Sequence, residues 1–138
     1  MQSVSEATNV NVARIADADG NPVKDEDGNP LTLSGGTAIT INDKEIIAAG
    51  GVNREIFEDA ISGNYRCIAQ KEYMLQPAEW YRFNDRLLTF DTKKEEWRIT
   101  LKDKTFARAG SLLTADTGHI YYIGGELKPG IRTPEIFK

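Results

Sequence analysis

With 138 residues the chain has room for one ordinary domain, and its 40% hydrophobic content suffices for a packed core. The formal charge of −4 and the pI of about 5.1, without any Lys/Arg-rich run, exclude the basic surface of a nucleic-acid-binding protein. The apolar runs are far shorter than the roughly 18 residues that cross a bilayer. We therefore expect neither nucleic acid nor a membrane as a partner.

The chain start and the single cysteine constrain the chemistry. Residues 1–6 contain neither a basic nor an apolar stretch, so no signal peptide is predicted within this chain. One cysteine, Cys67, and one histidine, His119, can form neither an internal disulfide nor a zinc site. We expect Cys67 to be a small buried or half-buried side chain, and we predict no metal and no organic cofactor.

Residues 1–32 are predicted to hold a strand and a turn-rich linker. Residues 9–15 alternate apolar and polar side chains, which is typical of a strand, here the outer strand of a blade-like sheet. The segments 19–23 and 27–31 both read Asp-Gly-Asn-Pro followed by an apolar residue. Counted from Asp17, this spacing lacks the glycine and the glutamate that an EF-hand calcium loop requires. Solvated β-turns are therefore the favoured interpretation.

The strongest signal is an internal repeat. When Gly36 is aligned with Gly110, the following positions match without a gap, and Gly50-Gly51 falls on Gly124-Gly125. Each copy contains two apolar or β-branched runs separated by turn residues and closed by the double glycine. These runs predict strands at residues 37–41 and 45–49 in the first copy, and at 111–115 and 120–123 in the second.

The first copy continues into a complete blade. Strands are predicted at residues 86–91 and 96–100, and the second of these carries Trp97. Two strands, a double glycine, an aromatic strand and a Trp form the kelch pattern, so residues 33–101 predict one four-stranded β-propeller blade. Kelch units repeat at about 50 residues, and the excess lies in an insertion at 54–83.

The insertion is predicted to be ordered. Residues 54–61 carry apolar side chains at helical spacing, which predicts a short helix. The run at 80–83 contains Trp80, Tyr81 and Phe83. We favour packing of these aromatic rings onto the blade, with a sugar-facing wall as the alternative.

Residues 102–138 predict a partial second blade, with a third strand at 134–137 after a loop. The fold class is therefore all-β, with about two four-stranded antiparallel blades of a kelch-type propeller. Two blades leave sheet faces and edges uncovered, so we expect a homo-oligomer. A trimer would close a six-bladed ring, in which the N-terminal strand of one chain completes the last blade of its neighbour.

Two segments resemble a known family. Residues 50–57 read Gly-Gly-Val-Asn-Arg-Glu-Ile-Phe, and residues 125–133 read Gly-Glu-Leu-Lys-Pro-Gly-Ile-Arg-Thr. Both are similar to motifs of the cyclically permuted kelch mutarotases, the N-acetylneuraminate epimerase family, and the similarity extends over about residues 33–138. The resemblance implies a six-bladed propeller, a sugar substrate, catalysis without a cofactor and a periplasmic location.

The resemblance implies that Glu126 is the proton acceptor. It follows the double glycine at the end of an inner strand, although an exposed glutamate paired with Lys128 or Arg132 is the alternative. Arg132 is the candidate to bind a sugar carboxylate through its planar fork, or else forms a structural ion pair. Asn53 either binds sugar hydroxyl or N-acetyl groups or forms a turn. Arg54 and Lys128 are further candidates for substrate binding.

Three functions are compatible with the sequence. The leading hypothesis is a mutarotase that interconverts the anomers of N-acetylneuraminate or a related sugar by general acid/base ring opening. A non-catalytic propeller that binds a glycan or a protein is the alternative from another class. A truncated product without activity is the third possibility.

Overall fold

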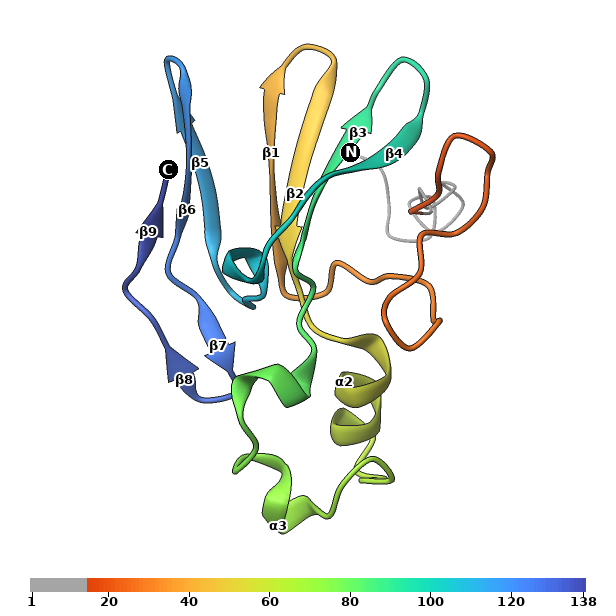
Figure 1. Cartoon of the computed structure of the whole chain (residues 1–138), viewed down its shortest axis with the longest axis vertical. Helices are drawn as coiled ribbons and strands as arrows, with labels where there is room; N and C mark the ends of the chain where they lie inside the picture. The colour runs from red at the N-terminus through yellow and green to blue at the C-terminus, as the bar shows by residue number, and fades with distance from the viewer. Residues whose placement is uncertain (1–14) are drawn as a thin grey trace, which may run out of the picture.

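The computed structural model describes residues 15–138, so the strand predicted at residues 9–15 lies almost wholly outside the described residues. A four-stranded antiparallel sheet forms the first blade, and each strand pairs with the next along the chain. Figure 1 shows these four strands side by side. They are β1 (Gly36–Asn42), β2 (Glu45–Gly50), β3 (Arg86–Asp91) and β4 (Glu96–Lys102).

A second antiparallel sheet lies beside the first (Figure 1). It contains β5 (Leu112–Asp116), β6 (His119–Ile123) and the short strand β9 (Ile136–Phe137), paired in that order. The two sheets share a core in which Ile47 and Ala49 of β2 pack with Leu113 and Tyr122. The fold class predicted from the sequence, antiparallel propeller blades of the kelch type, is confirmed.

The segment between β6 and β9 differs from the loop expected there. It folds into a hairpin of β7 (Glu126–Lys128) and β8 (Ile131–Arg132). Pro129 and Gly130 connect the two strands, and Gly130 has a φ of 81°. Proline followed by a glycine with positive φ is the signature of a type II turn, which explains why this segment reverses direction.

The double glycines allow a close approach between the blades. Gly50 has a φ of +73°, and a Cβ there would lie 2.5 Å from the carbonyl oxygen of Arg108 and 2.6 Å from the hydroxyl of Tyr122. Any larger residue would therefore force the blades apart. The junction between the blades depends on this glycine.

The insertion folds below the strand ends (Figure 1). It comprises α2 (Arg54–Ile61), α3 (Gln70–Tyr73) and the 3-10 helix η1 (Ala78–Tyr81), and a second 3-10 helix, η2 (Lys104–Phe106), follows β4. The short helix is found where the sequence predicts it. Tyr81 is 1% exposed, and its ring meets those of Tyr73 and Trp80 edge to face at 5.6 and 5.1 Å. Among residues 15–138, no helix is long and apolar enough to cross a membrane.

The linker forms two similar turns. The carboxylates of Asp17 and Asp25 accept hydrogen bonds from the backbone N–H groups of Asn21 and Asn29, at 2.9 and 3.0 Å. Asp27 departs from the expected solvated turn, because its carboxylate accepts a hydrogen bond from the Asn53 amide at 2.7 Å and pairs with Arg82. The linker is thereby tied to the start of the insertion.

Candidate functional site

In the first blade, the double glycine is bonded to the start of the third strand. The side-chain amide of Asn84 donates to the carbonyl oxygen of Gly50 at 3.0 Å, and its backbone N–H donates to that of Gly51 at 2.9 Å. The Asn84 side chain in turn accepts a hydrogen bond from the backbone N–H of Arg86 at 3.1 Å. This network joins the two segments of chain that flank the insertion.

The second blade repeats the arrangement with different side chains. The backbone N–H of Thr133 donates to the carbonyl oxygen of Gly125 at 2.9 Å, and its hydroxyl accepts from the N–H of Glu135 at 3.2 Å. The guanidinium of Arg108 donates to the carbonyl oxygen of Gly124 at 2.8 Å. The sequence repeat is therefore also a structural repeat, and the Glu126 hairpin occupies the place that the insertion has in the first blade.

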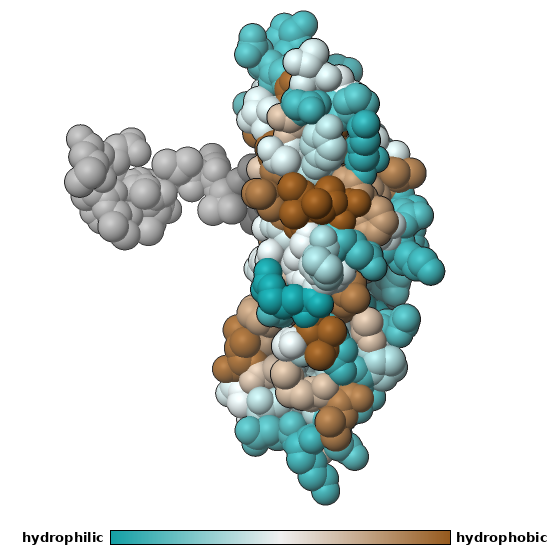
Figure 2. Space-filling view, turned by 90° about the vertical axis from the view of Figure 1, so that its left-hand side faces the viewer, coloured by the Kyte–Doolittle hydropathy of each residue, from teal (hydrophilic) through white to brown (hydrophobic). Residues whose placement is uncertain are grey.

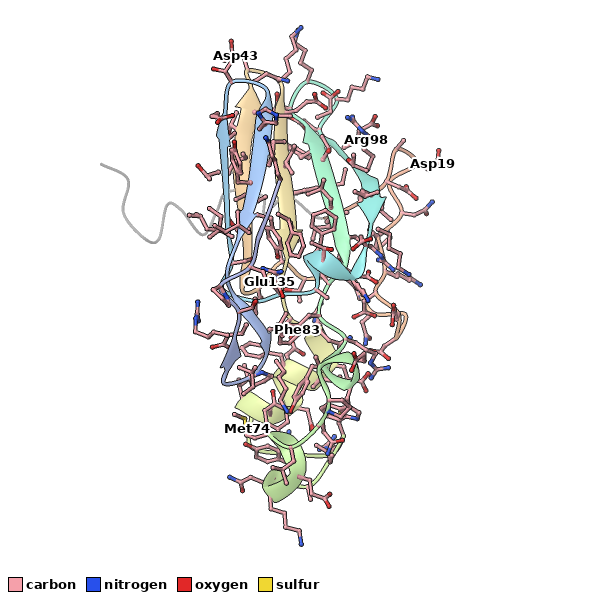
Figure 3. All side chains as sticks on the ribbon, turned by 60° about the vertical axis from the view of Figure 1, so that its left-hand side comes forward. Asp19, Asp43, Met74, Phe83, Arg98 and Glu135 are labelled. Carbon is pink, nitrogen blue, oxygen red and sulfur yellow. The ribbon has the colours of Figure 1, made fainter. Side chains whose placement is uncertain are left out.

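Glu126 lies at this corner on a fixed backbone. Its N–H donates to the carbonyl oxygen of Ala109 at 2.7 Å, and its own carbonyl oxygen accepts from the N–H of Ala109 at 3.1 Å. Glu126 is one of the residues that line a cavity of about 290 Å³ between the hairpin and the insertion. In Figure 3, Phe83, which also lines this cavity, lies at the waist between the sheets and the helices.

Arg132 lies across the hairpin from Glu126. The two residues are paired in the register of β7 and β8, and an Nη1 of Arg132 lies 3.5 Å from an Oε1 of Glu126. The arginine side chain is 63% exposed and the glutamate side chain 33%. The guanidinium is therefore largely exposed to solvent, where it keeps donors for a ligand while it contacts the carboxylate.

Lys128 contacts the insertion. Its ammonium donates to the carbonyl oxygen of Gln76 and lies 5.5 Å from the centre of the Tyr81 ring. A cation over an aromatic face is attracted by the ring quadrupole. The structure thus places Lys128 at a contact between the hairpin and the insertion, which we call the clasp.

Asn53 lines the same cavity, but its amide is already engaged. Its Oδ1 accepts from the N–H of Ile56 at 3.1 Å and caps α2, while its Nδ2 donates to Asp27. The residue is 4% exposed. This geometry is the one expected of a helix-capping asparagine.

Arg54 is not brought to Glu126. Its Nε lies 3.1 Å from the Glu58 carboxylate, one turn along α2. It lines a separate cavity of about 480 Å³, together with Asp59 and Cys67. Of the residues predicted from the sequence, the structure therefore brings Glu126, Arg132 and Asn53 to one corner and leaves Arg54 outside it.

Cys67 is exposed, so the expectation of a buried or half-buried side chain was wrong. The reason is the turn after α2, in which the Asp59 carboxylate accepts the backbone N–H groups of Arg66 and Cys67 at 2.7 and 2.8 Å. The bonds from Cys67 and then Arg66 lower the pKa of Asp59. Local desolvation of the thiol, followed by the hydrogen bond and charge of Asp59, raises the pKa of Cys67.

Sequence reasoning missed several residues of this corner. Arg108 is 1% exposed and lies under both double glycines, because its carbonyl oxygen also accepts from the N–H of Gly51 at 2.8 Å. Tyr73 and Phe57 of the insertion line the cavity. Alignment of the third strands of the two copies would have matched Asn84 with Thr133. The sequence carried no comparable signal for Arg108.

Two adjoining antiparallel blades with a carboxylate at their double-glycine corner define part of a β-propeller, with a candidate site at the blade ends. A family model described as N-acetylneuraminate epimerase matches residues 5–138. The chain therefore belongs to the N-acetylneuraminate epimerase family.

Individual relatives agree with this assignment. The chain is 30% identical over 107 residues to the N-acetylneuraminate epimerase of Yersinia enterocolitica, covering 71% of this chain and 27% of that protein. It is also 30% identical over 106 residues to the N-acetylneuraminate epimerase of Escherichia coli K12, covering 71% of this chain and 29% of that protein. A solved structure named "Structure of YjhT" superposes with a TM-score of 0.65 at 27% identity, over 80% of this chain and 34% of that chain. The chain thus spans about a third or less of the length of these relatives.

Proposed function

We propose that the corner carrying Glu126 interconverts the anomers of N-acetylneuraminate or of a related sugar acid. The observation that supports this most is the position of Glu126, which lines a cavity at the blade junction with Arg132 3.5 Å away. Membership of the N-acetylneuraminate epimerase family supports the reaction class.

The chemistry requires one proton acceptor and one proton donor. The Glu126 carboxylate takes the proton from the anomeric hydroxyl, and the electron pair of that O–H bond forms the carbonyl as the bond between the anomeric carbon and the ring oxygen breaks. The ring oxygen receives a proton from the protonated carboxyl or through water. The carbonyl then presents its other face, and the reverse proton transfers close the ring as the opposite anomer.

Arg132 would orient the substrate for this step. In a sialic acid the carboxylate is attached to the anomeric carbon itself. A guanidinium that binds this carboxylate bidentately therefore also fixes the position of the anomeric hydroxyl. Because Arg132 contacts Glu126, the hydroxyl proton would be held within reach of the base.

Replacement of Glu126 by Gln tests the proposal. The substitution keeps the shape of the side chain and removes its basicity, so anomer exchange followed by proton NMR should fall to the spontaneous rate while sugar binding persists. Gln replacement of Glu58, an exposed glutamate on α2, is the matched control and should leave exchange unchanged. A wild-type chain that never exceeds the spontaneous rate would refute the catalytic proposal for this chain.

A binding role without catalysis is the second candidate. It is favoured by the ion pair between Glu126 and Arg132, since a carboxylate held by an exposed arginine can serve recognition alone. Under this alternative, the chain binds a glycan or a protein. The Glu126→Gln variant then changes the affinity for that ligand and leaves the rate of anomer exchange at the spontaneous value.

We also propose that the chain assembles with copies of itself. The pairing partner of β9 is β6, and no strand of the described residues 15–138 pairs with its other edge. Exposed strand edges invite pairing with another chain. A trimer of two-bladed chains would close a six-bladed ring.

A further inference from the structure

The wall of the cavity beside Glu126 is mainly apolar. Aromatic side chains reach it from the insertion, namely Phe57, Tyr73, Tyr81 and Phe83, and Val52 and Pro129 add aliphatic surface. Such a wall lowers the free energy of apolar groups that leave water to contact it. The cavity wall next to the proposed base is therefore suited to contact a hydrocarbon group of the substrate.

Several polar atoms around this cavity are already bonded within the protein. Both the oxygen and the nitrogen of the Asn53 side-chain amide are hydrogen-bonded. The Tyr81 hydroxyl donates to the carbonyl oxygen of Tyr73, and the Ser34 hydroxyl lies 2.9 Å from the Thr32 hydroxyl. A sugar hydroxyl placed against these groups would lose water without an equivalent partner. The cavity therefore suits a substituent of the sugar better than its hydroxylated ring.

We infer that this cavity, the acyl recess, receives the acyl substituent of an N-acylated sugar acid. The inference rests on the proposed function and adds a determinant of substrate choice to it. In a sialic-acid ring, the carbon that bears the acylamino group lies across the ring from the anomeric carbon. Arg132 is exposed and contacts Glu126, which lines the recess, so a ring whose carboxylate meets Arg132 can extend its acyl group past Glu126 into the recess.

The size of the recess supports an acyl group longer than acetyl. A volume of about 290 Å³ exceeds what one methyl group fills, and Phe57 on α2 is a half-buried side chain that narrows it. Shortening Phe57 would widen the recess from the helical side. The preference among acyl groups should therefore depend on this residue.

Binding of three sugar acids to the whole chain, followed by protein-observed NMR titration, tests the inference. The three are N-acetylneuraminate, its N-propanoyl homologue and the analogue with a hydroxyl in place of the acylamino group. The hydroxyl analogue should bind wild type roughly 4- to 15-fold more weakly, as when one or two methyl-sized groups no longer leave water. Phe57→Ala should bring the acetyl and hydroxyl forms to within about twofold and shift the preference toward the propanoyl form.

Two further variants make the outcome decisive. Phe90→Ala is the same truncation on β3, where the ring packs 5.1 Å from Trp97 and lies outside the recess, so it should keep the wild-type affinity ratios. Val52→Ala replaces Phe57→Ala if circular dichroism shows that the latter is unfolded. Equal binding of all three sugar acids to wild type, or a Phe57→Ala variant that weakens all three equally, overturns the acyl recess alone. Absence of binding by every sugar acid overturns the proposed function, and the recess with it.

Discussion

Arg108 links the double-glycine corners of the two blades, since its carbonyl oxygen accepts from the N–H of Gly51. Its guanidinium donates to the carbonyl oxygens of Gly124 and Glu135, at 2.8 and 3.2 Å, and pairs with the Glu135 carboxylate at 3.1 Å. It also lies over the rings of Tyr122 and Phe137, at 5.4 and 4.7 Å from their centres. Figure 3 shows Glu135 just above Phe83 at the waist of the molecule.

Replacement of Arg108 by Met should destabilise the chain by roughly 2–4 kcal/mol, because the carbonyl oxygen of Gly124 loses the donor that this buried guanidinium provides and the Glu135 carboxylate loses its ion pair. The measurement is urea unfolding followed by circular dichroism. Arg98→Met is the matched control, since Arg98 pairs with Glu45 at 2.7 Å on the surface and its loss should hardly move the unfolding midpoint. Equal unfolding midpoints for the two variants would contradict this assignment.

The residues of the corner differ in how far the sequence could predict them. Glu126 and Arg132 stand in a motif that is dense enough to indicate a site from the amino-acid sequence alone. Arg108 could not be found in this way, because its role depends on two carbonyl groups that only the packing of the blades brings above it. A charged residue in an apolar stretch gives no sign of whether it is buried or solvated.

The pH dependence of the stability of the turn at Asp59 follows from the structure. The pKa of Asp59 is lowered in the folded chain, so the charged carboxylate stabilises the turn above the pKa of the unfolded state, and this stabilisation is lost as the pH falls through the lower folded value. Asp59→Asn should also remove the charge that raises the pKa of Cys67. We expect Cys67 to be alkylated several-fold faster in this variant.

Iodoacetamide labelling near pH 8, followed by mass spectrometry, measures that rate. Glu58→Gln is the control, because Glu58 is a neighbouring acid that pairs with Arg54 instead of the turn. An unchanged labelling rate in the Asp59→Asn variant would show that the carboxylate does not control the thiol.

At the scale of elements, the clasp joins two segments that are far apart in the sequence. Lys128 of β7 meets Gln76 and Tyr81 of the insertion, and a Cβ on Gly130 would lie 3.1 Å from the terminal methyl carbon of Met74. The hairpin and the insertion therefore form the two sides of one cavity. Loss of the clasp should loosen the insertion without unfolding the sheets.

Replacement of Lys128 by Met removes the ammonium and keeps the length of the side chain. Hydrogen exchange should speed up in residues 70–81, where few contacts remain, and stay unchanged in β1–β4. Lys102→Met is the control, since Lys102 lies at the surface 3.8 Å from Glu26 and far from the clasp in the sequence. Exchange that rises equally across β1–β4 would mean that Lys128 stabilises the whole chain instead.

The elements themselves were largely predictable, and their hydrophobic period explains why. The strands of the first blade and α2 carry apolar side chains at the spacing of their secondary structure, and the double glycines mark where strands end. The hairpin of β7 and β8 was missed because two or three residues are too few to show a period. Its Pro129-Gly130 turn was the available signal.

At the scale of the whole molecule, the described residues would supply one side of the proposed sugar site. The corner offers a carboxylate, a guanidinium and an apolar recess, but few free partners for the many hydroxyl groups of a sugar. The chain covers about a third or less of its relatives, whose additional length would have room for such partners. We therefore expect the affinity of this chain for a sugar to rise when it assembles.

Assembly is the prediction on which this view of the site depends. Apolar side chains gather on the side of the molecule shown in Figure 2. In the second blade, Leu112 and Ile136 share one face of the sheet through their common neighbour Ile123, and they are 54% and 62% exposed. Burial of such a surface between copies would favour association.

Light scattering should give about three times the chain mass of 15.3 kDa. Leu112→Lys should reduce this mass by placing a charge in the interface, whereas Ile61→Lys, on the insertion, should not. A wild-type chain that stays monomeric at every concentration would show that this face is tolerated in water and that the ring does not form.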